Sequence, residues 1–168
     1  SGDALTDADR NTVLGYQALS TDTRGSRSTA LGWNALASQN FTSATDTYNV
    51  AVGYSAGSEI TTGDSNTLIG GQAGDALNTG KNNTVVGKGA LGTDTKGKES
   101  VAIGNGALFT QNFTSLTNAF NTAVGSSAGG AVTNGTKNTL IGALAGDNID
   151  TGNDCLLYTS PSPRDCRL

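Results

Sequence analysis

Residues 66–82 have the sequence NTLIGGQAGDALNTGKN, and residues 83–99 continue with NTVVGKGALGTDTKGKE. Both are 17-residue stretches that run Asn, Thr, two apolar residues, Gly, two variable residues and Ala. We call such a stretch a rung. The chain contains eight rung starts, at Asn11, Ser28, Asn49, Asn66, Asn83, Ser100, Asn121 and Asn138. The two that begin with Ser are 21-residue rungs, and the others are 17-residue rungs. A short period of this kind predicts a repeat architecture.

A longer repeat is superimposed on the rungs. Four successive rungs form one unit, and residues 83–154 match residues 11–82 at 40 of 72 aligned positions. Residues 1–10 (SGDALTDADR) are similar to the end of a rung at 73–82 (AGDALNTGKN). We therefore predict one repeat array over residues 1–154, with a partial rung at 1–10 and two four-rung units at 11–82 and 83–154. We expect this array to be a fragment of a longer one.

The end of the chain differs in composition from the rest. Residues 155–168 (CLLYTSPSPRDCRL) hold both cysteines and both prolines, whereas residues 1–154 hold all 24 glycines. The stretch Cys155–Asp165 resembles the translation of a sequencing adapter, so we interpret residues 155–168 as a non-native tail. The alternative is a genuine proline-containing end. Without the tail the array has no cysteine, which leaves no disulfide and no thiolate metal site.

The columns of the rung predict its local structure. The apolar pair, such as Leu68-Ile69, is short and rich in β-branched residues, which favours one strand per rung and a first inward column. The Gly that follows marks a corner with positive φ or close backbone approach, and the Ala three residues later is a second inward column in a narrow interior. The Asn that begins a rung should stack with its neighbours as a ladder of amides. The corner glycines are Gly15, Gly32, Gly53, Gly70, Gly87, Gly104, Gly125 and Gly142, and the ladder asparagines are Asn11, Asn49, Asn66, Asn83, Asn121 and Asn138.

These columns predict an all-β fold, a parallel β-solenoid of 17- and 21-residue rungs. Because the side chains of the interior columns are small, a single coil buries little apolar surface and a lone rod is only marginally stable. We therefore expect rods to be stabilised by oligomerisation along their length.

The rungs NTVLGYQAL, NTLIGGQAG, NTVVGKGAL and NTAVGSSAG resemble the head repeats of trimeric autotransporter adhesins. They are still more similar to the repeat arrays of bacteriophage tail fibres, notably those of marine phages, and the likeness covers residues 1–154. The adhesin heads imply a left-handed parallel β-roll, and both families imply a homotrimer that attaches a virion or a cell to a surface. The 17- and 21-residue rungs are longer than the adhesin pattern, which favours the tail fibre. The resemblance thus implies a structural and adhesive fibre module, located in a virion tail fibre or on an extracellular surface. A bacterial surface adhesin head is the alternative.

Composition argues against several other functions. The chain has no His, which removes His-based acid–base catalysis, Ser-His-Asp triads and His-ligated metals. Its net charge of −4 argues against a nucleic-acid partner, because phosphate neutralisation needs clustered Lys and Arg. No stretch approaches the roughly 18 apolar residues of a membrane-spanning helix, so we expect no membrane insertion. We also expect no cofactor, no metal ion and no enzymatic activity.

The two 21-residue rungs carry insertions, Ala37–Tyr48 (ASQNFTSATDTY) and Phe109–Phe120 (FTQNFTSLTNAF). The insertions contain five of the nine aromatic residues of the chain, namely Phe41, Tyr48, Phe109, Phe113 and Phe120. Aromatic rings beside Gln, Asn, Ser and Thr suit a cell-surface glycan or protein receptor, and binding often resides on loops of a rigid scaffold. The alternative is that these rings pack over the strand edge or bury a contact between chains.

Further candidates lie on the rungs themselves. Tyr16 and Trp33 occupy the variable position after the corner Gly and should be half-exposed. A column of threonines also leaves open an ice-binding solenoid, although Val50 and Val101 interrupt it. A polysaccharide-cleaving tailspike fragment is the third class of function. The threonine column is Thr12, Thr29, Thr67, Thr84, Thr122 and Thr139.

Overall fold

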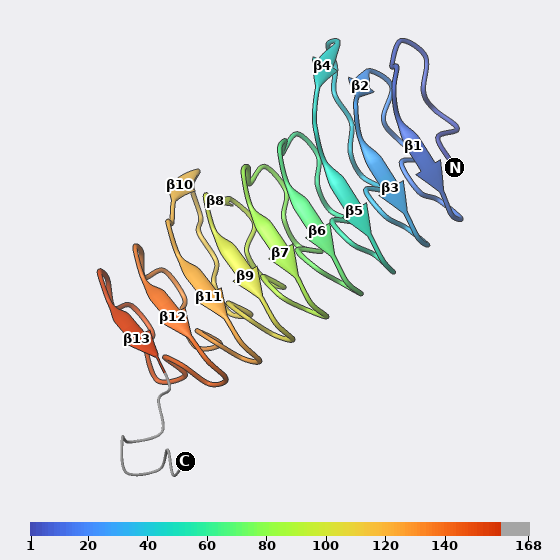
Figure 1. Cartoon of the computed structure of the whole chain (residues 1–168). Coiled ribbons are helices and arrows are strands. Elements are labelled where there is room, and N and C mark those ends of the chain that lie inside the picture. The colour runs from blue at the N-terminus through green and yellow to red at the C-terminus, as the bar shows by residue number, and fades with distance from the viewer. Residues whose placement is uncertain (159–168) are drawn as a thin grey trace.

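The structure is a computed structural model that describes residues 1–158. Within these residues it contains short strands joined by turns, and no helix. The chain coils into a rod in which each coil lies on the one before it (Figure 1). Nine strands, one per coil, form a parallel sheet along the rod, so the fold is the predicted β-solenoid. These strands are β1 (Thr12–Leu14), β3 (Thr29–Leu31), β5 (Val50–Val52), β6 (Thr67–Ile69), β7 (Thr84–Val86), β9 (Val101–Ile103), β11 (Thr122–Val124), β12 (Thr139–Ile141) and β13 (Leu156–Tyr158).

Strand pairing follows the columns of the rung without a slip. Thr12 of β1 pairs with Thr29 of β3, which pairs with Val50 of β5. The second of these steps crosses a 21-residue rung and keeps the same register, because the extra residues leave the coil as an insertion. Paired strands are about 4.8 Å apart, so nine of them form a rod roughly 40 Å long.

Only the first member of each apolar pair faces the interior. Leu68 is fully buried, with 0% of its surface exposed, whereas its neighbour Ile69 is 40% exposed. Successive side chains of a strand point to opposite faces, so two adjacent residues cannot both enter the narrow coil. The expectation of an inward-facing pair is therefore wrong for the second member, which lies on the outer face with the residue that begins the strand.

Glycine is required at each corner for both of the predicted reasons. Gly87 has a φ of +135°, and a Cβ at this position would overlap the backbone carbonyl group of Gly104 in the next coil. All eight corner glycines have φ values between 116° and 141°. The positive φ at each corner is unfavourable for any residue with a side chain. The neighbouring coil also lies so close that a side chain would not fit.

The interior is filled by compensating columns. The Ala column is buried throughout, and the next column carries either Leu or Gly. Where that column has Gly57, the residue three positions later is the larger Ile60, and a Cβ on Gly57 would lie 3.1 Å from its Cδ1. Where the column has Leu91, the residue three positions later is Asp94 instead. Each coil therefore reaches a similar packed volume with a different pair of residues.

The ladder asparagines link the coils. Asn66 is fully buried, and its Nδ2 donates to the carbonyl oxygen of Gly80 across the same coil at 2.9 Å. Its Oδ1 accepts a hydrogen bond from the backbone N–H of Asn83 in the next coil at 3.0 Å. Bonds from amide to amide, as the sequence predicted, also join successive coils, from Asn66 Nδ2 to Asn49 Oδ1 at 3.4 Å and from Asn83 Nδ2 to Asn66 Oδ1 at 3.2 Å. Equivalent bonds recur at Asn11, Asn49, Asn83, Asn121 and Asn138.

The last described strand lies in the segment that we interpret as a tail. β13 pairs with β12, and the backbone N–H of Cys155 donates to Asn138 Oδ1 at 3.0 Å. An open strand edge pairs with any extended backbone, so this pairing does not depend on the origin of the segment. Residues 159–168 of the proposed tail lie outside the described residues. Over residues 1–158 the structure has no helix that could cross a lipid bilayer.

Candidate functional site

The extra residues of the 21-residue rungs leave the rod on one side. β4 (Thr45–Asp46) lies beside β2 (Gly25–Ser26), and β10 (Thr117–Asn118) lies beside β8 (Gly97–Lys98), each pair being parallel. Figure 1 shows both pairs at the same edge of the rod, beyond the nine-stranded sheet. The two insertions, which lie in separate four-rung units, are therefore displayed in the same direction.

A buried carboxylate anchors each insertion. Asp94 is 0% exposed, and its Oδ1 accepts hydrogen bonds from the backbone N–H of Gly97 at 2.9 Å and of Phe113 at 3.3 Å. Its Oδ2 accepts from Gln111 Nε2 at 2.6 Å, and Gln111 Oε1 accepts from Asn121 Nδ2 at 2.8 Å. The first unit repeats this network with Asp22, Gly25, Phe41, Gln39 and Asn49.

The surroundings of Asp94 indicate a structural role. Burial raises the pKa of the Asp94 carboxyl group, and the hydrogen bonds from Gln111 and from backbone N–H groups oppose that rise. The groups that bond to its two oxygens are all N–H donors, which suits the ionised form. The carboxylate organises the start of the insertion and is sealed from solvent.

The aromatic residues of the insertions divide into two sets. Phe41 and Phe113 are only 7% and 6% exposed, so they have little surface to offer a ligand. Tyr48, Phe109 and Phe120 are 53%, 46% and 49% exposed. The structure thus separates the five candidates into two packing residues and three surface residues.

Among the exposed rings, Phe109 and Tyr48 have different surroundings. Phe109 lies over a glycine surface, with Cε2 2.9 Å from the position that a Cβ on Gly92 would take. Tyr48 lies beside Arg27, whose guanidinium carbon is 5.5 Å from the ring centre. The hydroxyl group of Tyr48 donates to Asp46 Oδ2 at 3.4 Å. Tyr48 therefore contacts two residues that line a surface groove.

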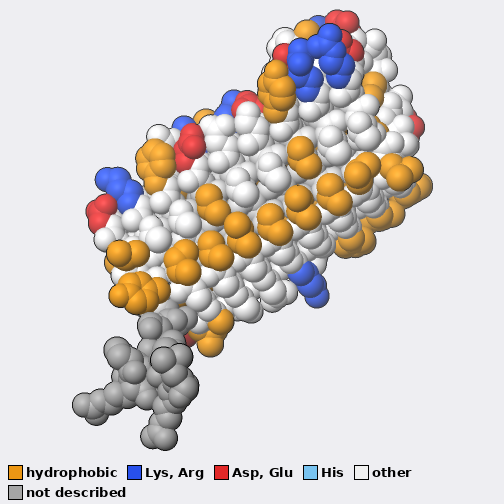
Figure 2. All heavy atoms as spheres, in the orientation of Figure 1, with side chains coloured by type: hydrophobic (Ala, Val, Ile, Leu, Met, Phe, Trp, Pro, Cys, Tyr) orange, Lys and Arg blue, Asp and Glu red, His pale blue; other side chains and the backbone are white. Residues whose placement is uncertain are grey.

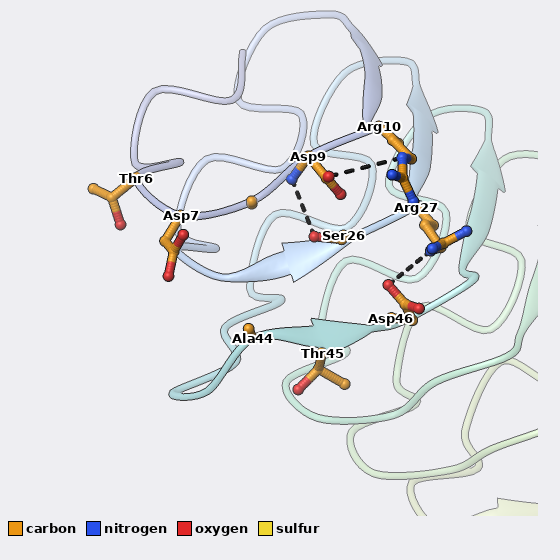
Figure 3. Close-up of a pocket in the computed structure, with 10 residues that line it drawn as sticks. Thr6, Asp7, Asp9, Arg10, Ser26, Arg27, Ala44, Thr45 and Asp46 are labelled. Carbon is orange, nitrogen blue, oxygen red and sulfur yellow. Dashed lines mark hydrogen bonds and ion pairs between the residues drawn. The ribbon is translucent and has the colours of Figure 1, made fainter.

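This groove lies between the partial rung and the first insertion and has a volume of about 590 Å³. Figure 3 shows Arg27 paired with Asp46, at 2.7 Å between Nε and Oδ1, and Arg10 beside Asp9 at 3.7 Å. A hydrogen bond with Asp46 raises the pKa of Arg27 above its ordinary value, so the guanidinium stays charged. The groove offers donors and acceptors of both charges. Its lining residues are Thr6, Asp7, Ala8, Asp9, Arg10, Ser26, Arg27, Ala44, Thr45 and Asp46.

A smaller groove of about 360 Å³ lies at the second insertion. At the positions of Arg27 and Asp46 the second unit has Glu99 and Asn118. The residues that line this groove are uncharged, so the two insertions share a buried anchor but present different surfaces. They are Asn112, Phe113, Thr114, Ser115, Thr117, Asn134, Thr136, Thr151 and Asn153.

The outer face of the nine-stranded sheet carries a surface that the sequence pattern did not predict. Because the second member of each apolar pair points outward, one such side chain per coil lies in line along the rod. Leu14 is 71% exposed, and Ile69 and Ile141 are each 40% exposed. Figure 2 shows a band of hydrophobic side chains along the rod. We call these residues the apolar row: Leu14, Leu31, Val52, Ile69, Val86, Ile103, Val124 and Ile141. Strand alternation within Thr-x-x was the signal that could have found it.

Across residues 1–158, no group of three or more Cys, Asp, Glu or His side chains is placed to hold a metal ion. Comparisons with protein-family models, curated proteins and solved structures find no match for this chain.

Proposed function

We propose that the chain is a structural and adhesive module of an attachment fibre, in which three copies of the rod assemble side by side through the apolar row. The row is the observation that carries this proposal. Its members keep strict register over eight rungs, and the apolar face they form is uncovered in the described chain. Four of its members are exposed and the other four are half-buried, and contiguous exposed apolar surface on a soluble protein commonly marks an interaction site.

A second copy of the same rod is the partner that best matches the row. The row is straight, and its side chains recur at the spacing of the coils, about 4.8 Å. A surface with the same period is found on another copy of this chain. Identical faces arranged around an axis parallel to the rods would remove every row from water. The number three comes from the resemblance to trimeric fibres and adhesins.

Assembly through the sheet would leave the insertions free. Both lie at an edge of the rod beyond the nine-stranded sheet, so a receptor on a cell surface could reach them. The groove with Arg27 and Asp46 supports a contact with a ligand rich in hydroxyl groups, since carboxylate and guanidinium groups bond to hydroxyls. We place the module in a virion tail fibre, with a bacterial surface adhesin head as the alternative.

Light scattering of the full chain after gel filtration tests the assembly. We expect a mass three times the 16.8 kDa of one chain. The double variant Ile69→Asp, Ile103→Asp should lose the trimer, because it places two carboxylates in the row. The control Ser115→Asp, Asn118→Asp adds the same charge on the second insertion and should remain trimeric. A folded monomer of the unaltered chain would contradict the proposal.

One observation favours a second function, that of an ice-binding rod. The threonine column lies on the same outer face as the apolar row, because both flank the buried residue of each strand. Thermal hysteresis of the purified rod tests this alternative, and we expect none. Incubation with host polysaccharide tests for a tailspike activity, and we expect no shortening of the polymer.

A further inference from the structure

Three exposed aromatic residues occupy the same position of three consecutive coils, and two of them stack. Tyr16, Trp33 and Tyr54 each follow a corner glycine, and they are 69%, 43% and 57% exposed. The rings of Trp33 and Tyr54 are stacked, with centroids 4.9 Å apart and planes within 8°. Backbone hydrogen bonds hold this spacing: Asn34 N–H donates to the Tyr16 carbonyl oxygen at 2.9 Å, and Ser55 N–H donates to that of Trp33 at 2.8 Å. We call Tyr16, Trp33 and Tyr54 the aromatic ladder.

The second four-rung unit shows that the rod does not need this ladder. At the equivalent positions it has Lys88, Asn105 and Ser126, all of them exposed. The same backbone bonds are present there, as from Ser127 N–H to the Asn105 carbonyl oxygen at 2.8 Å. The apolar row, in contrast, is present in both units. Because neither the folding of the coil nor the apolar row needs the aromatic ladder, we infer that the ladder serves to bind a ligand.

The ladder has an open end. Trp33 covers one face of Tyr54, and the coil on the other side carries Gly71 at the ladder position. A Cβ on Gly71 would have no other group within 4 Å, so the ring of Tyr54 meets no side chain from that position. The next residue in this column is Lys88, one coil further on. A gap one coil wide therefore lies beside a free aromatic face.

Three of the four polar residues that directly follow ladder positions are amides, and the fourth, Ser55, is buried. Gln17 and Gln72 are exposed, and Asn34 is half-buried, each directly after a ladder position. No Lys, Arg, Asp or Glu occupies these two columns within residues 11–82. Aromatic faces carry negative partial charge and attract the C–H groups on one face of a hexose ring, while amides donate to and accept from its hydroxyl groups. Within residues 11–82 these columns give no advantage to an anionic ligand, and Lys88, on the far side of the gap, is the one cation of the ladder column within residues 11–154.

We propose that the aromatic ladder binds a neutral polysaccharide, with a hexose ring stacked on Tyr54 in the gap at Gly71. The chain of sugars runs along the rod across Trp33 toward Tyr16. This inference rests on the proposed attachment function and adds to it the class of receptor and a site outside the insertions.

Exchange of residues between the two units provides the test. The variant Tyr54→Ser places the second unit's residue in the first unit, and Trp33→Asn does the same one coil earlier. The reciprocal variant Lys88→Tyr, Asn105→Trp, Ser126→Tyr, Ala143→Gly builds a second ladder, with its gap, on the same backbone. Each replacement already exists in this fold at the equivalent position, and circular dichroism checks that the variants are folded.

Affinity electrophoresis in gels that contain dextran, mannan or xyloglucan measures binding, with alginate as the acidic control. We expect retardation of the full chain by a neutral polymer, about tenfold weaker binding for Tyr54→Ser, and stronger binding for the reciprocal variant. Trp33 is the only tryptophan of the chain, so a change in its emission with the same polymer reports contact at the ladder.

Retardation by no neutral polymer, by alginate alone, or equally in Tyr54→Ser would overturn the proposal. A change of oligomeric state in Tyr54→Ser would also overturn it, because the ladder would then belong to the contact between copies. Light scattering separates the two proposals. A monomer that binds through the ladder contradicts assembly alone, and a trimer that binds no neutral polymer contradicts the ladder site alone.

Discussion

The carboxylate of Asp94 and the amide of Gln111 lie in successive coils, and Gln111 Nε2 donates to Asp94 Oδ2 at 2.6 Å inside the rod. Asp94 belongs to the coil before the second insertion, and Gln111 is the first buried side chain within it. The same relationship joins Asp22 to Gln39 at 2.5 Å in the first unit. The extra residues of a 21-residue rung are thus tied to the regular coil beneath them.

We expect Asp94→Asn to destabilise the rod. The new amide would direct its own N–H groups toward either Gln111 Nε2 or the backbone N–H groups of Gly97 and Phe113, so two donors would face each other. An unsatisfied buried group costs about 1–3 kcal/mol, which urea denaturation resolves. Asp147→Asn, at an exposed position, is the control and should leave the free energy of unfolding unchanged. Equal stability of the two variants would contradict the structural role.

Asp75 should contribute more to the free energy of unfolding at low pH than at neutral pH. Desolvation raises the pKa of Asp75 above 3.8. A carboxyl group with a higher pKa in the folded chain binds its proton more readily there, so protonation of Asp75 as the pH falls from 7 toward 4 stabilises the folded chain relative to the unfolded one. Urea titrations at both pH values should show that the unaltered chain gains stability relative to Asp75→Asn as the pH falls. An identical pH dependence in both would exclude Asp75 as a source.

Two Gly→Ala substitutions should have opposite effects on stability, because one glycine has a strained backbone conformation and the other does not. Gly87→Ala forces a side chain into φ +135° and against the carbonyl group of Gly104, so we expect a loss of at least about 3 kcal/mol or no folded protein. Gly71→Ala meets an open site without positive φ, and it should be neutral or stabilising by up to about 1 kcal/mol. Thermal melts followed by circular dichroism compare the two. Similar melting temperatures would contradict the corner assignment.

Removal of one ladder asparagine should weaken the rod locally. Asn66→Ala leaves the Gly80 carbonyl oxygen and the Asn83 N–H without their partner inside the coil, and we expect a loss of about 2–5 kcal/mol. Hydrogen exchange should show the largest loss of protection at the backbone N–H of Asn83. Asn134→Ala, on the exposed surface, serves as the control. Uniform exchange in both variants would contradict a local role.

The sequence could predict the fold because each rung repeats the same pattern of residue types. The period places one strand in each coil, and Gly87 and its equivalents have to turn where no other residue turns easily. Ala90 and its equivalents limit the interior to small side chains. These properties depend on residues within one rung, so each of the eight rungs independently predicts the same strand, corner and inward column.

The candidate site was predicted only in part. The insertions were identified, and Tyr48, Phe109 and Phe120 are on the surface, but Phe41 and Phe113 are buried. An aromatic residue in a loop has no periodic pattern that fixes which way it points. The apolar row was not predicted, because two adjacent apolar residues are equally compatible with a pair in which both are buried. Only the alternation of side chains along a strand assigns Ile69 to the outer face.

The sequence by itself determined the coil period, the strand and corner positions, and the columns that stack. Only the tertiary structure decided how one coil meets the next: that Leu68 packs against Gly57, that Gln111 reaches Asp94, and that Trp33 stacks on Tyr54. The physical reason is that a repeat encodes each coil separately. Contacts between coils depend on register and on the direction of side chains across the gap, which exist only once the coils are stacked.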